Sequence, residues 1–193
     1  MATRFLDKVT TPTTTDTPNL PNAAGIAYDT TTGTLVYNDA GTLRYITAGN
    51  TAPVTASGTT LTASPSLHAG RTVLLTNVAG CAVTLPAATG SGAKYRFVRG
   101  AALTSGSDVI SAAASELFAG FSITEDSGDT TPADATIFAT VNASTNTWTN
   151  AFSAGGGEIG DFFECEDIAT DRWSVKGWIQ AVLDSTATPF SAV

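Results

Sequence analysis

The chain has 193 residues, a net charge of −8 and 13% charged residues, and its sequence pI is near 4.3. Few charged side chains leave little material for long helices stabilised by ion pairs, while Thr, roughly one residue in six, favours extended backbone. The acidic balance argues against nucleic acid or an anionic membrane as the main partner, because binding to phosphates needs clustered Lys and Arg.

An extended N-terminal arm is predicted for residues 1–25. Pro12, Pro18 and Pro21 remove backbone donors from this segment, and Thr holds much of the remainder in extended conformations. Such a segment has no apolar core of its own, so we expect it to bind a partner.

The compartment is inferred from charge and apolar run length. The first residues, MATRFLDKV, carry charges at Arg4, Asp7 and Lys8, so we expect no secretory signal and synthesis in the cytoplasm. No apolar run approaches the roughly 18 residues of a membrane-spanning helix, so we expect no membrane anchor. In a reducing compartment Cys81 and Cys165 are expected to be free, buried thiols.

A small β-meander is predicted next. Residues 26–47 contain three short apolar runs separated by the turn sequences DTTTG and NDAG, with Tyr28, Leu35 and Tyr45 supplying β-prone bulk. Residues 48–60, AGNTAPVTASGTT, are small and polar and are interpreted as a linker, so the meander and linker occupy residues 26–60.

Strand signals then recur from residue 61 to residue 183, with turns rich in Gly, Ser, Asn and Asp between them. The predicted strands are Thr72–Val78, Cys81–Leu85, Lys94–Arg99, Asp108–Ser111, Leu117–Thr124, Thr136–Asn142, Thr147–Phe152, Asp161–Ile168 and Arg172–Leu183. Alternate apolar residues are expected to line a buried face in several of them, namely Cys81, Val83 and Leu85; Tyr95 and Phe97; Ile137, Ala139 and Val141; and Trp173 and Val175.

These signals predict an all-β chain whose body, residues 61–183, is a jelly-roll-like β-sandwich. Ala112–Phe118 is the only segment expected to be helical. Residues 184–193 are interpreted as a C-terminal tail, in which Phe190, directly after Pro189, can serve as an apolar anchor.

Candidate catalytic and metal-binding groups are few. His68 is the single histidine, and we interpret it as a solvated loop residue because polar residues and a turn flank it. One histidine and two separated cysteines are too few ligands for zinc. Gly90–Lys94 leads into a strand rather than a helix, so it predicts a tight turn and not a phosphate loop. We expect no catalytic residue, no cofactor and no metal.

Carboxylates gather in two places. The loop EDSGDTTPAD contains Glu125, Asp126, Asp129 and Asp134. Calcium binding is the alternative to a metal-free loop here, although the spacing of the carboxylates does not match the helix-flanked calcium loop. The second group surrounds the strand FFECEDI and consists of Glu158, Asp161, Glu164, Glu166, Asp167 and Asp171. Glu164 and Glu166 are expected on its solvated face, and Phe163 and Cys165 on its buried face. A glycosidase pair is conceivable there, but no acid and nucleophile stand out.

Positive charge concentrates around one predicted strand, which carries Lys94, Arg96 and Arg99, with Arg71 as a further cation. Lys94 and Arg96 share a face and are candidate contacts for acidic residues of a neighbouring subunit, with a plain solvated face as the alternative. Trp148 lies in the polar stretch ASTNTWTN and is interpreted either as a core residue or as an exposed contact.

Three segments carry a family resemblance. Residues 61–98 have the order strand, Gly-turn, VTLP, Gly-turn, KYRFV; residues 160–178 have Gly-Asp, strand, turn and Trp-x-Val-x-Gly; the third is the meander, residues 26–47. They resemble the small β-sandwich decoration, or cement, proteins of tailed-phage capsids and the related head-fibre proteins. The resemblance implies a jelly-roll body, a homotrimer and a position outside an icosahedral head between major capsid protein subunits. It implies no catalytic residues.

The leading hypothesis is therefore a structural virion protein of the capsid exterior, synthesised in the host cytoplasm. Its expected partners are the major capsid protein of the same virion and further copies of itself, and neither nucleic acid nor a membrane. Phe5, Leu6 and Leu20 are the predicted apolar anchors of the arm, with Arg4 as a charged partner.

A second hypothesis is a tail-fibre or baseplate component that binds a host surface glycan. In that case Trp148 and the acidic loop at residues 125–134 would supply the sugar and cation contacts. A glycan hydrolase carried on a virion is the third hypothesis.

Overall fold

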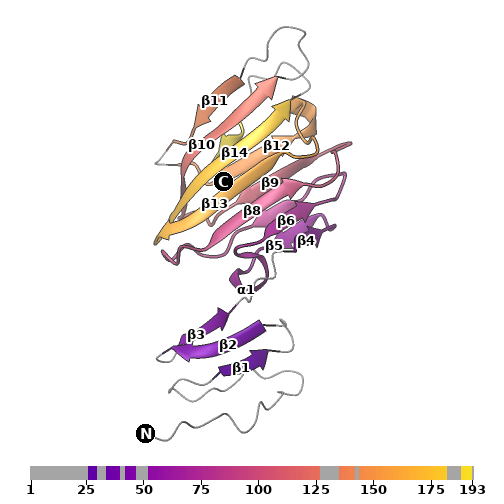
Figure 1. Ribbon diagram of the computed structural model, residues 1–193. Helices are drawn as coiled ribbons and strands as arrows, with labels where there is room; N and C mark the ends of the chain where they lie inside the picture. The colour runs from indigo at the N-terminus through magenta and orange to yellow at the C-terminus, as the bar shows by residue number, and fades with distance from the viewer. Residues whose placement is uncertain are drawn as a thin grey trace, which may run out of the picture. The chain divides into compact units, whose positions relative to one another are not determined.

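The computed structural model describes residues 26–29, 34–39, 42–46, 52–126, 135–141, 144–181 and 188–192, the first three ranges as backbone strands only (Figure 1). The chain divides into two compact units, Met1–Asn50 and Thr51–Val193. The predicted arm, residues 1–25, lies outside the described residues. No helix within these ranges is long and apolar enough to cross a membrane.

The first unit contains the predicted meander. Strands β1 (Ile26–Asp29), β2 (Thr34–Asp39) and β3 (Thr42–Ile46) form a three-stranded antiparallel sheet in sequence order. Turn-forming sequences separate β-prone segments here, so neighbouring strands pair locally. The prediction for residues 26–47 is therefore confirmed.

The second unit is a two-sheet β-sandwich. A seven-stranded sheet has the order β11-β10-β14-β13-β8-β6-β4, and a five-stranded sheet has the order β15-β12-β9-β7-β5. The bounds are β4 (Val54–Ala56), β5 (Thr60–Thr62), β6 (Thr72–Leu75), β7 (Ala82–Thr84), β8 (Lys94–Arg99), β9 (Ser107–Ser111), β10 (Leu117–Asp126), β11 (Ala135–Ala139), β12 (Thr147–Ala151), β13 (Phe162–Ala169), β14 (Arg172–Ala181) and β15 (Phe190–Ser191). All nine strands predicted between residues 61 and 183 are present.

Parallel pairing distinguishes this sandwich. From β4 to β9 the chain alternates between the sheets, so that β4, β6 and β8 pair in parallel in one and β5, β7 and β9 in the other. The pairs β4–β5, β6–β7 and β8–β9 thus lie on one another as three stacked rungs. β10 and β14 also run parallel. A jelly roll is built from antiparallel strands, so the all-β sandwich is confirmed but its jelly-roll form is not.

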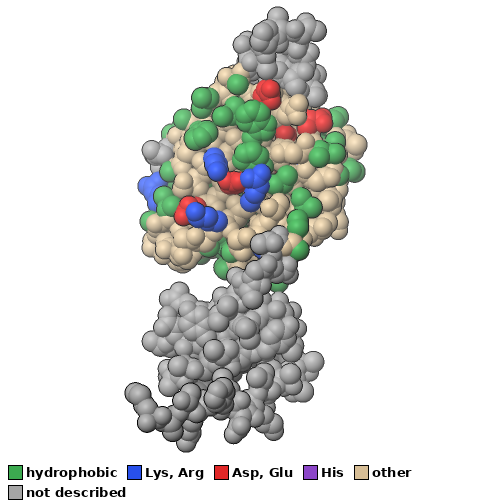
Figure 2. Space-filling view, viewed as in Figure 1, with side chains coloured by type: hydrophobic (Ala, Val, Ile, Leu, Met, Phe, Trp, Pro, Cys, Tyr) green, Lys and Arg blue, Asp and Glu red, His purple; other side chains and the backbone are tan. Residues whose placement is uncertain are grey.

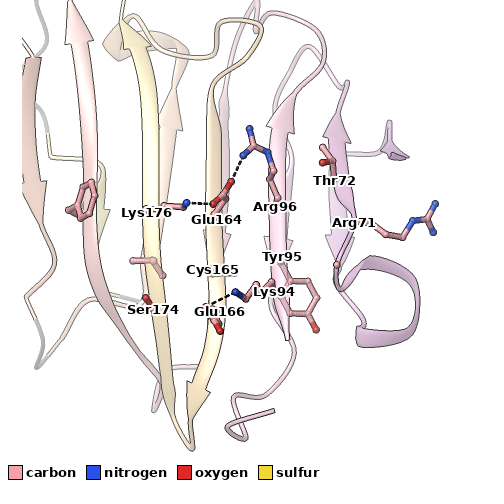
Figure 3. A pocket seen from close by; sticks show the side chains of 13 residues that line it. Arg71, Thr72, Lys94, Tyr95, Arg96, Glu164, Cys165, Glu166, Ser174 and Lys176 are labelled. Carbon is pink, nitrogen blue, oxygen red and sulfur yellow. Dashed lines mark hydrogen bonds and ion pairs between the residues drawn. The ribbon is translucent and has the colours of Figure 1, made fainter. Parts of the chain in front are cut away.

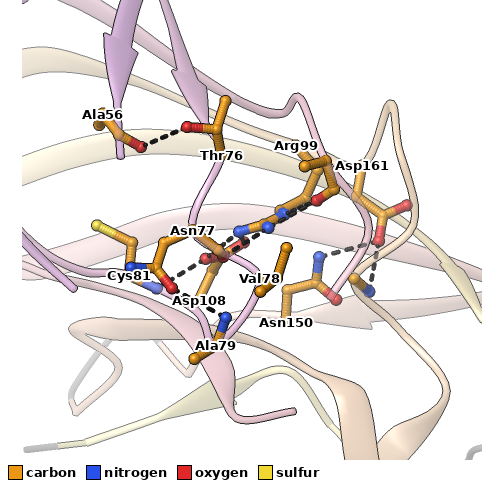
Figure 4. Close-up of polar contacts among 12 residues, drawn as sticks. Ala56, Thr76, Asn77, Val78, Ala79, Cys81, Arg99, Asp108, Asn150 and Asp161 are labelled. Carbon is orange, nitrogen blue, oxygen red and sulfur yellow. Dashed lines mark hydrogen bonds and ion pairs between the residues drawn. The ribbon is translucent and has the colours of Figure 1, made fainter. Parts of the chain in front are cut away.

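A buried ion pair joins the stacked turns (Figure 4). The Arg99 guanidinium donates to both carboxylate oxygens of Asp108 at 2.8 and 3.0 Å, and to the Asn77 carbonyl oxygen at 2.8 Å. The Cys81 N–H donates to Asp108 at 3.0 Å. Burial raises the pKa of Asp108, while the charge of Arg99 opposes that shift. Arg99 is therefore part of the core, unlike Lys94 and Arg96 of the same strand.

Aromatic side chains fill the space between the sheets. Trp148 of β12 packs on Phe163 of β13 with ring centroids 5.0 Å apart, and its indole N–H donates to the Ser122 hydroxyl at 3.1 Å. Phe118 and Phe163 lie 5.6 Å apart, centroid to centroid. Trp148 is only 2% exposed, so the interpretation of this residue as a surface contact is wrong and its interpretation as core is confirmed.

Four expectations about local structure are corrected. Residues 54–62 include β4 and β5, so the body begins within the predicted linker rather than at residue 61. Phe190 does anchor the tail, but within this sandwich, where β15 pairs with β12. Residues 112–116 are not helical; the described helices are instead α1 (Pro65–His68) and the 3₁₀ turn η1 (Phe152–Ala154). His68 at the end of α1 is buried and not solvated.

The predicted buried face of the strand near residue 137 is also wrong. Ile137 is 67% exposed and Val141 is 63% exposed, whereas Phe138 turns towards the core and is partly buried. β11 is the edge strand of the seven-stranded sheet, with β10 as its single neighbour. The more apolar face of this strand therefore points outward.

Candidate functional site

The outer face of the seven-stranded sheet carries a cluster of charged side chains on β8, β13 and β14. On β8, Tyr95 and Phe97 point into the core while Lys94 and Arg96 point outward. On β13 the outward positions are Glu164 and Glu166, and Phe163 and Cys165 are buried, as the alternation predicted. These strands are neighbours in the sheet, so their outward charges lie side by side.

Strand register arranges these charges in rows across the sheet. Arg96, Glu164 and Lys176 are successive partners on β8, β13 and β14. Glu164 forms ion pairs with both neighbours, at 2.6 Å to the Lys176 ammonium, and accepts a hydrogen bond from Arg96 (Figure 3). In the next row, Lys94 pairs with Glu166 at 3.4 Å. One carboxylate therefore holds two cations in place.

The cations are more exposed than the carboxylates that they pair with. The side chains of Lys94, Lys176 and Arg96 are 69%, 58% and 44% exposed, against 22% for Glu164 and 40% for Glu166. Burial raises the pKa of Glu164, but hydrogen bonds and charges from Lys176 and Arg96 outweigh this and lower it below its ordinary value. Glu164 thus stays ionised, and solvent meets mainly positive charge.

A shallow groove of about 470 Å³ runs over these rows (Figure 3). It is lined by Gly70, Arg71, Thr72, Lys94, Tyr95, Arg96, Phe121, Glu164, Cys165, Glu166, Ser174, Val175 and Lys176. Its four cations exceed its two carboxylates, whereas the whole chain carries a net charge of −8. Arg71 is held by the carbonyl oxygens of Ala52 and Leu67. The groove is therefore a positive region on an acidic protein.

An apolar row lies beside the charged rows. Register places five apolar residues from five adjacent strands in line across the sheet: Val98, Phe162, Trp178, Ile123 and Ile137. Phe121, 44% exposed, continues this surface into the groove. The Arg96 guanidinium lies 4.7 Å from the centre of the Phe162 ring, so the apolar and charged rows are in contact. Figure 2 shows these hydrophobic side chains next to the charged cluster on one face.

Several carboxylates that looked like candidate catalytic groups stabilise loops instead. Asp161 accepts hydrogen bonds from the Asn150 amide and from the N–H groups of Gly157, Glu158 and Gln180. Burial raises the pKa of Asp161, and these hydrogen bonds oppose that shift. Both oxygens of this buried carboxylate are engaged with its own chain.

Glu116 and Asp167 are used in the same way. Glu116 accepts from the Ala88 N–H at 2.9 Å and from the Trp173 indole N–H at 2.8 Å. Asp167 accepts from the N–H groups of Thr89, Gly90 and Ser91 and from the Ser91 hydroxyl. Asp161 and Asp167, two carboxylates of the acidic group around β13, are therefore committed to internal hydrogen bonds.

His68, Cys81 and Cys165 are buried. The His68 Nδ1 atom accepts a hydrogen bond from the Ser64 N–H at 2.9 Å, and burial lowers the pKa of this imidazole. Cys81 and Cys165 are both free and buried, as predicted. Burial raises the pKa of each thiol, which disfavours the reactive thiolate.

The predicted contact residues have different outcomes. Lys94 and Arg96 lie in the groove and are exposed, so they remain candidate contacts. Trp148 is core. The arm anchors Arg4, Phe5, Leu6 and Leu20 lie outside the described residues, as do residues 127–134 of the acidic loop. Within the described ranges, no three His, Cys, Asp or Glu side chains are grouped to hold a metal ion.

Lys176, Phe121 and Arg71 were not identified as site residues from the sequence. The signal for Lys176 was present, because alternation from the apolar Trp173 and Val175 places Lys176 on the outer face. Its exact partner, Glu164, was not predictable, because an irregularity between Asp167 and Ala169 shifts the register of the antiparallel β13–β14 pair.

No family model matches the chain, and the search of curated proteins returns no match. The fold and the outer-face groove are therefore the features from which a function is inferred.

Proposed function

We propose that the chain is a structural virion protein of the capsid decoration type, which binds the outside of an icosahedral phage head and stabilises the major capsid protein lattice. The observation that carries the proposal is the outer face of the seven-stranded sheet, where an apolar row adjoins exposed cations. Charged and apolar groups adjoining on a flat, rigid surface suit contact with another protein. The resemblance of residues 26–47, 61–98 and 160–178 to decoration proteins supplies the class of partner.

The buried carboxylates support a structural role. Asp161, Asp167 and Glu116 bind main-chain N–H groups of loops, so the acidic groups of the body hold its shape. A protein that reinforces a lattice has to resist deformation, and buried carboxylates with satisfied hydrogen bonds supply that rigidity.

Mass action gives the mechanism. A protein that binds only the assembled, expanded lattice stabilises that lattice by the free energy of binding. A homotrimer would multiply weak contacts through effective concentration, and the arm, residues 1–25, would add reach. Phe5, Leu6 and Leu20 are its proposed apolar anchors, and Arg4 its charged one.

The test uses expanded, DNA-free heads of the phage that encodes the chain, purified without this protein. The intact protein should cosediment with these heads and raise the temperature at which they rupture. Protein lacking residues 1–24 should bind more weakly. If the intact protein does not bind, the decoration role is wrong; if truncated and intact proteins bind equally well, only the role of the arm is wrong.

A tail-fibre or baseplate component that binds host glycan is the second candidate. The groove favours it, because the exposed Phe121 ring beside Ser174 and cations offers a stacking surface and polar contacts for an acidic sugar. Trp148 can no longer be its sugar contact, since that side chain is buried. Binding of purified host surface polysaccharide that Phe121→Ala abolishes, in a protein that does not bind heads, would favour this candidate.

A further inference from the structure

The apolar row and the cationic row together form a surface with one apolar side and one cationic side, which we name the outer-face strip. It consists of Val98, Phe162, Trp178, Ile123 and Ile137 on the apolar side and Arg96, Lys176 and Lys94 on the cationic side, with Phe121 next to Lys176 at the end of the charged row. We propose that this strip docks an acidic amphipathic α-helix of a protein partner. The inference rests on the proposed function, since it describes the capsid surface that would be held.

The length of the apolar row fits one helix. The apolar row crosses five strands, and neighbouring strands lie about 4.8 Å apart, so the row is about 19 Å long. A helix rises about 1.5 Å per residue, so about 13 residues would cover the row. That is an ordinary length for one helix of a globular protein.

The backbone hydrogen bonds of the occupant also favour a helix. The strip lies on the face of the sheet, whose backbone groups pair within the sheet, and not along an edge. An extended peptide laid across this face would leave its own N–H and C=O groups without backbone partners. A helix satisfies these groups internally and presents one apolar stripe, which makes it the better occupant.

The spacing of the exposed cations fits acidic side chains on such a helix. Arg96 and Lys176 lie on β8 and β14, two strand spacings apart, which is about 10 Å. Acidic side chains seven positions apart on a helix are separated by about the same distance. The carboxylate between the two cations, Glu164, is the least exposed of the three side chains, so it does not repel an acidic partner as strongly as the cations attract it. The chain as a whole is acidic, so exposed cations here give an acidic partner a local region of attraction.

The contact between Arg96 and Phe162 explains why one helix would use both rows. The guanidinium stacks 4.7 Å from the ring centre and is thereby fixed at the border of the apolar row. A helix whose apolar stripe packs on Phe162 and Trp178 therefore brings the acidic flank of that stripe to the cations.

The experiment measures binding of a fluorescein-labelled, 18-residue helical peptide to the full chain by fluorescence anisotropy. The peptide carries Leu along one stripe and Glu along one flank of it. Three further probes are a scrambled peptide of the same composition, a peptide with Lys in place of Glu, and polygalacturonate as an acidic glycan.

Variants separate the two rows. Lys94→Gln/Lys176→Gln removes two positive charges from the strip, and Ile137→Ser/Phe121→Ser removes exposed apolar surface. The charge-matched control is Thr60→Glu/Thr84→Glu, which also changes the net charge by two but at exposed positions of the five-stranded sheet. Each variant is used only if its urea midpoint matches that of the parent chain.

We expect the patterned Glu peptide to bind, and each strip variant to weaken it about tenfold while the control leaves it unchanged. Equal binding of the scrambled peptide or of the Lys peptide would overturn the proposal. Absence of peptide binding would also overturn it. If polygalacturonate bound as tightly as the peptide and competed with it, the proposal would be overturned and the strip assigned to an acidic glycan. A different result tests the proposed function: if the intact chain does not bind heads while the peptide still binds, the decoration role is wrong and the docking site is not.

Discussion

At the scale of single residues, the glycine-rich segment after residue 89 binds an anion of its own chain. Thr89, Gly90 and Ser91 direct their N–H groups at the Asp167 carboxylate, at 3.0, 2.6 and 2.9 Å. Successive main-chain N–H groups form a concave site for negative charge, which is the arrangement that phosphate-binding loops use. The sequence correctly predicted a turn here rather than a phosphate loop, but it gave no sign that a carboxylate 76 positions away would occupy the turn.

Asp167 should therefore stabilise the fold in a pH-dependent way. Burial raises its pKa, but the hydrogen bonds from Ser91, Thr89 and Gly90 outweigh this and hold it at about 2. The folded state binds this proton less readily than the unfolded state, so the stabilisation is present above about pH 4 and is lost as the pH falls towards 2. The shift corresponds to on the order of 2 kcal/mol.

The measurement is urea unfolding of the parent chain and Asp167→Asn between pH 2 and pH 7. We expect the variant to be less stable at pH 7 by at least that amount, because its amide N–H₂ group meets the N–H donors of the turn. The difference in stability between the parent chain and the variant should shrink as the pH falls towards 2. Glu166→Gln, at an exposed neighbouring position, is the control and should change stability little. A constant difference across the pH range would contradict this role for Asp167.

At the scale of secondary-structure elements, the stacked rungs depend on close contact between their turns. A Cβ atom at Gly106 would overlap the Ala79 carbonyl oxygen, and one at Gly80 would overlap the Ser107 carbonyl oxygen. Each turn thus lies directly against the backbone of the other. The buried Arg99–Asp108 pair lies beside this contact and ties the same turns together.

Gly106→Ala should destabilise the chain far more than Gly92→Ala. Both glycines have left-handed backbone angles, φ +67° and +71°, so both substitutions incur the same backbone strain of about 1–2 kcal/mol. Only Gly106 has a neighbouring backbone in the way, since nothing lies within 4 Å of a Cβ at Gly92. We expect an additional loss of about 2 kcal/mol or more for Gly106→Ala, measured from urea midpoints. Equal losses in the two variants would show that the turns are not in rigid contact.

The elements also show how far sequence patterns reach. Alternation found all nine strands between residues 72 and 181 because their turns contain strong breakers and their apolar residues recur every second position. β4 and β5 were missed because strands of three residues, rich in Thr and Ala, carry little apolar signal. The face of β11 was wrong because the alternation rule buries the face with more apolar residues, whereas the single large ring of Phe138 packs against the core and leaves Ile137 outside.

Parallel pairing was not predictable for a related reason. Short turns normally return the chain antiparallel to the preceding strand in one sheet. Here each short turn instead crosses to the opposite sheet, so strands 19 to 27 positions apart become neighbours, as with Val54 and Val73 or Val83 and Ile110. The charged rows of the groove lie instead on antiparallel pairs, of β13 with β14 and of β13 with β8.

At the scale of the whole molecule, the second unit should fold without the first. Residues 51–193 contain both sandwich sheets and the complete core cluster. A unit with its own core is expected to unfold cooperatively by itself. A protein consisting of residues 51–193 should therefore unfold within about 2 °C of the main thermal transition of the full chain. A markedly lower midpoint would show that residues 1–50 contribute to the stability of the sandwich.

The position of β14 has a consequence for synthesis. The three rungs pair strands that are close in sequence, so they can assemble while the chain is still emerging from the ribosome. β10 has to wait, because its parallel partner β14 begins 55 positions later, at Arg172 opposite Leu117, and lies between β10 and β13. Until Ala181 is released, β10 and β11 have no sheet to join, and the exposed Ile137 and Phe121 surface is at its most vulnerable to aggregation during that interval.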